Sequence, residues 1–176
     1  MPRILPVILA AVALTVGVRA DGQDPTMHQQ HMAGLVVDGR QLIEFPAPMR
    51  QHMLANMRGH LNALSDILAA LAKDDYHEAA ALADTQLGMN SPSAAGCRME
   101  DSDAPKMSPA PDMDQHMMQL MPESMRKIGL EMHQAASDFA TEATKAAKSG
   151  DGKLTLTALS RITAQCTACH AAYRVH

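Results

Sequence analysis

Hydrophobic residues recur at helical spacing along most of this chain. Behind Pro48 they follow alternating steps of four and three residues, at Met57, Leu61, Leu64, Leu68 and Leu71. Such a repeat is typical of a helix with one buried face, so the pattern predicts a helix over about 48–73 with this seam in the core. A second helix is predicted over about 75–87, capped by Asp74-Asp75 and ended by Gly88.

The same periodicity returns in the C-terminal half. A short helix is predicted over 113–120, and a long one over about 122–148 has its apolar positions at Met125, Ile128, Met132, Ala135, Phe139, Ala143 and Ala146. Ser149-Gly150 ends this helix, and Asp151 is placed to cap the next one. The last helix is expected to bury one face, formed by Leu156, Leu159, Ile162, Cys166, Cys169 and Tyr173.

These elements predict an all-α fold. No stretch shows the alternation of a strand and most connections are short, so we expect an up-down-up-down four-helix bundle over 48–176. Its one long connection, at about 89–121, is rich in proline, serine, glycine and aspartate, as loops are. Residues 21–47 show no sustained period and are expected to form a partly mobile N-terminal tail.

The strongest chemical signal is Cys166-Thr167-Ala168-Cys169-His170, in the last predicted helix. Two thiols at this spacing on one helical turn can add to the two vinyl groups at one edge of a porphyrin, and the following histidine can bind the iron as proximal ligand. A redox dithiol usually accompanies a βαβ pattern, and a zinc site needs a further ligand pair. Neither is seen in the sequence. The motif therefore predicts one covalently bound haem c, held by Cys166, Cys169 and His170.

Residues 1–20 have the pattern of a cleaved secretory signal. Arg3 is followed by an apolar run over 4–16 and by Val18-Arg19-Ala20 before a polar stretch, and the run is too short to favour a membrane span. We therefore expect an exported chain that begins near Asp21 and has no membrane-spanning segment. Removal of the signal takes two positive charges from a chain whose net charge is already −4, which argues against nucleic acid as a partner.

The composition is unusual in its lack of aromatic residues. Hydrophobic residues make up 47% of the chain but aromatic residues only 2%, and there is no tryptophan. A core of alanine, leucine and methionine lacks large flat groups. A haem would supply one.

Four helices with C-x-x-C-H on the last, followed by an aromatic and a basic residue at Tyr173-Arg174, resemble the cytochrome c-prime family. The resemblance covers about 48–175 and implies a periplasmic haem protein. It also implies that a homodimer through the first two helices is allowed, since this is frequent in the family. High-spin members keep the sixth iron position open and bind nitric oxide or carbon monoxide. Low-spin relatives fill it with a methionine of the first helix and transfer electrons.

The residue of the first helix that faces the iron decides between these two states. Counting back from Tyr76 at the spacing of the family leads to Met57, which also lies on the seam. Aligning Arg50-Gln51 with the Arg-Gln pair of many members leads instead to Leu54, which cannot ligate. Met53, one turn before Met57, is a third candidate. A thioether suits haem iron and raises its reduction potential, although methionine at helical spacing is more often core packing. Met57 is the predicted distal ligand, with the other two left open.

Other residues near the motif have a plain interpretation as well as a functional one. Arg174, four residues past His170, could contact a haem propionate, as the resemblance suggests, or be a solvated arginine. Tyr173 is expected to pack against the haem ring or the bundle. His60 is kept as an outside candidate for the sixth ligand. The helix and loop histidines are nevertheless most simply exposed, namely His52, His60, His77, His116 and His133.

Soft side chains elsewhere allow a different class of function. Two pairs in the tail, Met27-His28 and His31-Met32, could hold copper. The same holds for methionines of the long connection, at Met107, Met113, Met117, Met118 and Met121. A mobile tail and a loop packed over the bundle would also explain them. Cys97, the odd cysteine, could form an intermolecular disulfide or remain a free thiol.

Together these observations predict a periplasmic monohaem c-type cytochrome that exchanges single electrons with redox partner proteins and is not an enzyme. The alternative is a high-spin cytochrome c-prime that binds nitric oxide or carbon monoxide. A metal-handling protein that uses the Met and His clusters is a third alternative.

Overall fold

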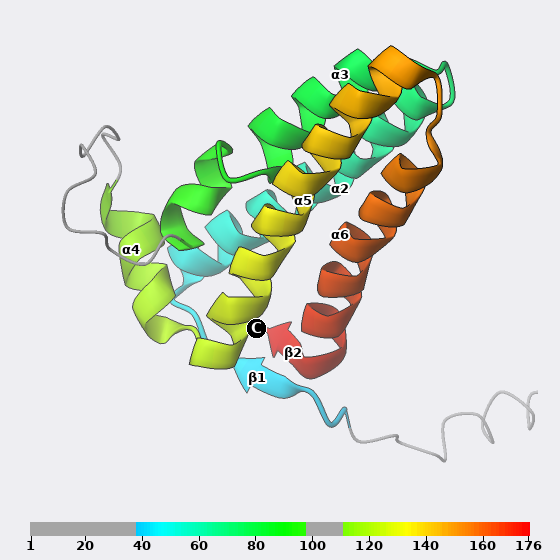
Figure 1. Ribbon diagram of the computed structural model, residues 1–176. Coiled ribbons are helices and arrows are strands. Elements are labelled where there is room, and N and C mark those ends of the chain that lie inside the picture. The colour runs from blue at the N-terminus through cyan, green and yellow to red at the C-terminus, as the bar shows by residue number, and fades with distance from the viewer. Residues whose placement is uncertain (1–37, 98–110) are drawn as a thin grey trace, which may run out of the picture. The chain divides into compact units, whose positions relative to one another are not determined.

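The computed structural model describes residues 38–97 and 111–176, and most of these are helical (Figure 1). The α-helices are α2 (Ala47–Leu71), α3 (Tyr76–Leu82), α4 (Pro111–Leu120), α5 (Glu123–Ser149) and α6 (Lys153–Ala172). A π-helical turn, η1 (Ala83–Leu87), continues α3, and a 3-10 turn, η2 (Pro92–Cys97), follows it. The short strands are β1 (Gln41–Ile43) and β2 (Tyr173–Val175). The all-α prediction is confirmed, and these elements belong to one compact unit, Gly39–His176.

Several predictions fall outside the described residues. They concern the signal peptide, the two Met-His pairs of the tail, and Met107. Cys97 ends η2, but its side chain is not among those described. Within 38–97 and 111–176, no helix combines the length and the apolar character needed to cross a membrane.

The helices α2, α3, α5 and α6 run alongside one another in Figure 1. The helix α5 packs against both α3 and α6, and α2 packs against α3 and its π-helical turn. In the described part of the chain, α2 and α6 are not one of the closely packed pairs. The shorter helix α4 contacts η2 instead. This arrangement leaves room between the first and the last long helix.

Two hydrophobic clusters form the core. The larger one joins α2, α3, α5 and α6 around four fully buried side chains, those of Ile67, Leu87, Phe139 and Ile162. Alanines fill most of the space between these side chains, and small residues let helix backbones approach closely. The second cluster lies beside the strand pair and consists mainly of methionines, with Ile43, Phe45, Met53, Met117, Met121, Met125 and Tyr173 buried.

The seam predicted for the first helix is only partly correct. Leu61 and Leu68 are 68% and 52% exposed, while the other seam positions, Met57, Leu64 and Leu71, are half-buried. The buried face of α2 is made by Met53, Ala63, Ile67 and Ala70. Large apolar residues were expected to mark the core, but close packing against α3 favours alanine there. The leucine repeat therefore lies at the edge of the buried face and outside it.

The face predicted for the last helix needs a smaller correction. Leu156 is 59% exposed, whereas Thr155 is only 1% exposed. Leu159 and Ile162 are buried as predicted, and both cysteines are half-buried. The small residues Thr155 and Ala158 are buried near the start of α6, which packs closely against α5 after a short glycine-containing turn.

The helices end close to the positions predicted from the sequence, but some of these ends depend on contacts other than the predicted ones. Asp75 caps α3, since its Oδ1 accepts a hydrogen bond from the Glu78 N–H at 3.0 Å. Gly88 follows η1 with extended backbone, and a Cβ there would lie 2.9 Å from Ser137 Oγ of α5. A close approach, and not a left-handed conformation, requires this glycine. Asp151 accepts the Lys153 N–H at 3.0 Å, although the residue at the cap position of α6 is Gly152.

Residues 41–45, which the sequence placed in the tail, belong to the folded unit. The strand β1 pairs in parallel with β2, with Gln41 opposite Tyr173 and Ile43 opposite Val175. Ile43 and Phe45 are buried. A strand of three residues is too short to show a period in the sequence, which explains why it was missed. The pairing fixes the chain immediately after the C-x-x-C-H motif.

Candidate functional site

A cavity of about 400 Å³ opens between α2 and α6, and α4, α5 and η2 complete its wall. Cys166, Cys169 and His170 line it from the last two turns of α6. Both cysteines are half-buried and His170 is exposed. Cofactor and small-molecule sites have volumes of about 300–1,000 Å³. The motif singled out in the sequence therefore lies on the wall of a cavity of suitable size.

The end of α6 is anchored on two sides. Tyr173 leaves the helix in an extended conformation, its N–H donates to the Cys169 carbonyl, and its side chain is buried in the methionine cluster. The Tyr173 and Ser124 hydroxyls share a hydrogen bond. Arg40, just before β1, donates from Nη1 to the His170 carbonyl at 3.4 Å. Tyr173 thus packs against the bundle, next to the cavity lining, and holds the motif in place.

The wall formed by α2 contains all three candidates for the residue opposite the motif. Met53, Leu54 and Met57 each line the cavity. Met53 is buried, Met57 is half-buried and Leu54 is 38% exposed. The structure brings these side chains to one cavity with Cys166 and Cys169, but their proximity alone does not choose among them.

Methionines from α4 and α5 form a third side of the cavity. Its lining includes Met117, Met118, Met121, Met125 and Met132. Met117 of α4 and Met121, the residue after this helix, are buried, so these two methionines do not form the exposed copper-receptive surface considered from the sequence. They pack over the helices, which was the plainer interpretation. Methionine is flexible and polarisable, so this wall can adapt to the shape of a ligand.

The charged groups on the cavity wall have one sign. Among its described lining residues there are two arginines, Arg58 and Arg126, and no aspartate or glutamate. The whole chain, by contrast, carries more acidic than basic residues. An apolar wall with only cationic groups favours an apolar ligand that carries negative charge. Neither arginine could be recognised from the sequence, since both resemble ordinary helix-surface residues.

The two motif thiols are held in their protonated form. Burial raises the pKa of the Cys166 thiol above its ordinary value. Burial, and then the neighbouring Cys166, raise the pKa of Cys169. Cysteines that exchange disulfides have lowered pKa values, because the thiolate is the reactive species. These raised values argue against the redox-dithiol interpretation of the motif.

A pair of histidines lines the far side of the cavity. His133 is 2% exposed, so the prediction that it lies on the surface is wrong. Its Nδ1 bonds to the Leu87 carbonyl at 2.6 Å, at the end of the π-helical turn. The His60 ring meets the His133 ring edge-on, with centroids 5.7 Å apart, and His60 Nε2 bonds to Ser93 Oγ at 3.1 Å. These contacts explain the burial of two imidazoles in an apolar region.

We expect the histidine pair to make folding sensitive to acid. Burial, and then the charge of His133, lower the pKa of His60 from 6.5 to about 4. The folded chain then binds fewer protons than the unfolded chain between these values, so the free energy of unfolding should fall as pH drops from about 6.5 towards 4, by at most about 1.4 kcal/mol per pH unit. Urea unfolding of the haem-free chain across this range measures the slope.

The His60→Gln variant should flatten that slope, because glutamine does not titrate. His77→Gln is the matched control, since His77 is exposed at the start of α3, and it should leave the slope unchanged. An unaltered slope in His60→Gln would show that other groups cause the acid sensitivity.

Arg174 does not lie on the helical face where the sequence placed it. The helix α6 ends at Ala172, and Arg174 is the middle residue of β2, opposite Leu42. It is not among the described residues that line the cavity. The prediction assumed one more helical turn after His170, but the chain becomes extended at Tyr173 and pairs with β1. The geometric premise for a propionate contact is therefore wrong.

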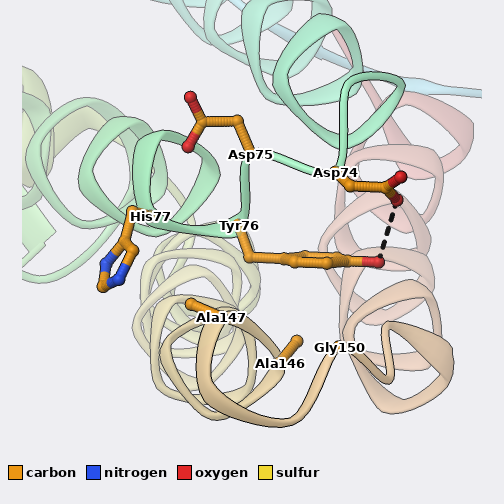
Figure 2. Close-up of a pocket in the computed structure, with 7 residues that line it drawn as sticks. All are labelled: Asp74, Asp75, Tyr76, His77, Ala146, Ala147 and Gly150. Atoms are coloured by element: carbon orange, nitrogen blue, oxygen red, sulfur yellow. Dashed lines mark hydrogen bonds between the residues drawn. The ribbon is translucent and has the colours of Figure 1, made fainter.

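A second hollow, of about 350 Å³, lies beyond the C-terminal end of α2 (Figure 2). The Tyr76 hydroxyl donates to Asp74 Oδ1 at 3.3 Å, as the dashed line in Figure 2 shows. Gly152 leaves room for this ring, because a Cβ there would lie 2.5 Å from Tyr76 Oη. The lining contains no cysteine or methionine. Its polar groups serve the turn, and it adds nothing to the chemistry of the first cavity.

Comparisons with protein-family models, with curated proteins and with solved structures find no match to this chain. In the described residues, no three side chains of His, Cys, Asp or Glu gather as a metal site. The function is therefore inferred from the residues of the cavity.

Proposed function

We propose that this chain is a monohaem c-type cytochrome, related to the cytochrome c-prime family, that carries out one-electron transfer in the periplasm. The observation that supports this most directly is a single cavity with Cys166, Cys169 and His170 on one side and the α2 thioethers on another. Attachment of haem c uses two thiols and a histidine, and a methionine can complete the iron's coordination. The donor set of the cavity fits that group.

The fold in this proposal is a four-helix bundle. Its helices are α2, α3 with η1, α5 and α6. The cavity separates the first and last of these, which is where a flat cofactor would be enclosed. The helix α4 belongs to the long connection and covers one side.

When bound, the haem would supply a redox-active iron, and the protein would set its ligands, burial and access. Cys166 and Cys169 would form the two thioether bonds, and His170 would bind the iron as the proximal ligand. Met57 is the proposed distal ligand, and a thioether in that position raises the reduction potential. No side chain is assigned a bond-making step on a substrate, so the protein is not proposed to be an enzyme.

The gas-binding function is the second candidate. It is favoured by Leu54, which lines the same wall as Met53 and Met57 and would shield an open iron position without binding to it. In that case nitric oxide or carbon monoxide would be the ligand.

The absorption spectrum of the reduced protein, produced with its haem-maturation machinery, separates the two functions. Sharp low-spin bands that carbon monoxide barely changes would support a strong sixth ligand and electron transfer. A broad high-spin spectrum that converts on adding the gas would support gas binding. A haem that stays attached after denaturation would exclude the metal-handling alternative, which uses the motif as a thiol or metal site.

A homodimer through α2 is part of the proposal. Leu68 of α2 is 52% exposed, belongs to neither core cluster and is not among the described residues that line the cavity. An exposed apolar side chain on a long helix can pair with a helix of another chain, and we take a second copy as the partner of this part of α2.

The Leu68→Glu variant is expected to shift a dimer to monomer, because it places charge in the paired face without touching the cavity lining. Sedimentation over a range of concentrations measures this. Leu156→Glu is the matched control, since Leu156 is equally exposed but lies on α6. A wild-type chain that stays monomeric at high concentration would refute the dimer.

A further inference from the structure

Arg126 of α5 has a position that the proposed function leaves unexplained. It lines the cavity and is half-buried. Its Nη1 donates to the Met118 carbonyl at 3.1 Å and to the Met121 carbonyl at 2.7 Å. These carbonyls belong to the last turn of α4 and the residue after it, where helix oxygens have no partner within the helix. Arg126 therefore fixes the end of α4 beside the cavity.

Those two bonds use one side of the guanidinium. The group has five N–H donors, of which Nη1 provides two, while Nε and Nη2 provide the other three. The Nε and Nη2 edge has the geometry that binds a carboxylate through two parallel hydrogen bonds. An arginine that is held by helix carbonyls on one side is thus prepared to bind an anion on the other.

The surroundings of Arg126 support such a role. Arg58 is the other arginine in the described lining, and it is exposed, whereas Arg126 is half-buried. The lining contains no acidic side chain among its described residues. Partial burial strengthens a charge-assisted hydrogen bond, since water screens it less.

We propose that Arg126 is the anchor for a carboxylate of the cavity's apolar ligand, and that the same guanidinium links this ligand to α4. The inference rests on the proposed function, in which the ligand is a tetrapyrrole with carboxylate side chains. A carboxylate on the Nε and Nη2 edge immobilises Arg126, and Arg126 in turn holds the C-terminal end of α4, where Met117 and the following Met121 cover one side of the cavity. Arg126 is a binding and positioning residue and takes part in no reaction step.

The test uses the full mature chain prepared without haem, titrated with metal-free protoporphyrin IX and with its dimethyl ester. Omitting the iron removes any effect of the axial ligands, and the ester removes only the carboxylates. Arg126→Gln should weaken binding of protoporphyrin IX about 10- to 100-fold more than it weakens binding of the ester, because only the acid loses hydrogen bonds between charged groups. Porphyrin fluorescence reports both affinities.

Two further variants sharpen the comparison. Arg126→Lys keeps the charge but not the paired hydrogen bonds, so its loss of affinity should be intermediate. Arg161→Gln is the matched control: Arg161 is exposed on α6 and is outside the described lining, so neither affinity should change. Circular dichroism checks that each variant retains its helices.

Hydrogen exchange tests the link to α4. Protoporphyrin IX should slow amide exchange over 117–121 in the wild-type chain and have no such effect in Arg126→Gln. A structural role for Arg126 alone would change exchange equally with and without the porphyrin, and this result would overturn the link.

Other outcomes would overturn the anchor itself. They are an equal loss of affinity for the acid and the ester, no loss in Arg126→Gln, or a selective loss in Arg58→Gln instead. Should Arg126→Gln fail to fold, equal binding of acid and ester by the wild-type chain would still refute the anchor. Failure of the proposed function is recognised separately, as the absence of covalent haem from protein made with the maturation machinery.

Discussion

Replacement of both Cys166 and Cys169 by alanine is expected to abolish covalent haem attachment completely. The two sulfurs are the groups of the cavity wall that can add to the vinyl groups of a porphyrin, since a methionine thioether has no S–H to add. Haem staining of a denaturing gel, with the intact mass of the chain, measures the loss. Each single variant should keep one thioether bond and a reduced yield.

Cys97→Ala is the matched control for this experiment. It removes a thiol of the same chain that is not part of the C-x-x-C-H motif, so the haem content should stay at the wild-type level. Covalent haem in the double variant, or its absence from the wild-type protein, would refute the proposed attachment site. Because the pKa values of both cysteines are raised, we also expect their thiols to react slowly with alkylating agents near neutral pH.

The position of the helices could be predicted because the relevant signals are local. Periodicity, the Asp75 cap and the glycines at the helix ends depend on neighbouring residues, and the helices begin and end close to the expected positions. The orientation of α2 could not be predicted. Which face is buried depends on the helices it packs against, and alanines at that contact were outweighed in the sequence by leucines at its edge.

The residues of the candidate site also differ in whether the sequence alone could identify them. The C-x-x-C-H motif is contiguous, so it could be found from spacing alone. His133 and Arg126 reach the cavity from α5, more than thirty residues from the motif, and nothing in their local sequence marks them. Arg174 was assigned to the site by assuming that α6 continues, but pairing of β2 with β1 redirects the chain. A three-residue strand gives no warning of this in the sequence.

The sequence offers three candidates for the residue at the distal side of the proposed haem. In the structure all three line the cavity. Met53 belongs to the buried methionine cluster and Leu54 is the most exposed of the three. Met57 is half-buried and lies against the same cluster. A side chain that must turn towards a cofactor needs freedom that a tightly packed core residue lacks, and it must not be far from the cavity. Met57 combines these properties best.

Met57→Ala is therefore expected to convert a low-spin reduced haem into a high-spin one that binds carbon monoxide, and to lower the reduction potential, because loss of the thioether removes the ligand that favours ferrous iron. Absorption spectra with and without the gas, together with a potentiometric titration, measure both effects. Met53→Ala removes a thioether one turn away and is the matched control. It should keep the low-spin bands.

The opposite pattern, with bands lost in Met53→Ala and kept in Met57→Ala, would assign the distal ligand to Met53. Low-spin bands that survive in both single variants and in the double variant would exclude either α2 methionine as the ligand. Met53 and Met57 line the same cavity, so the double variant shows whether one of them replaces the other as the ligand. A reduction potential that falls in Met57→Ala and not in Met53→Ala would show that electron transfer depends on the Met57 side chain.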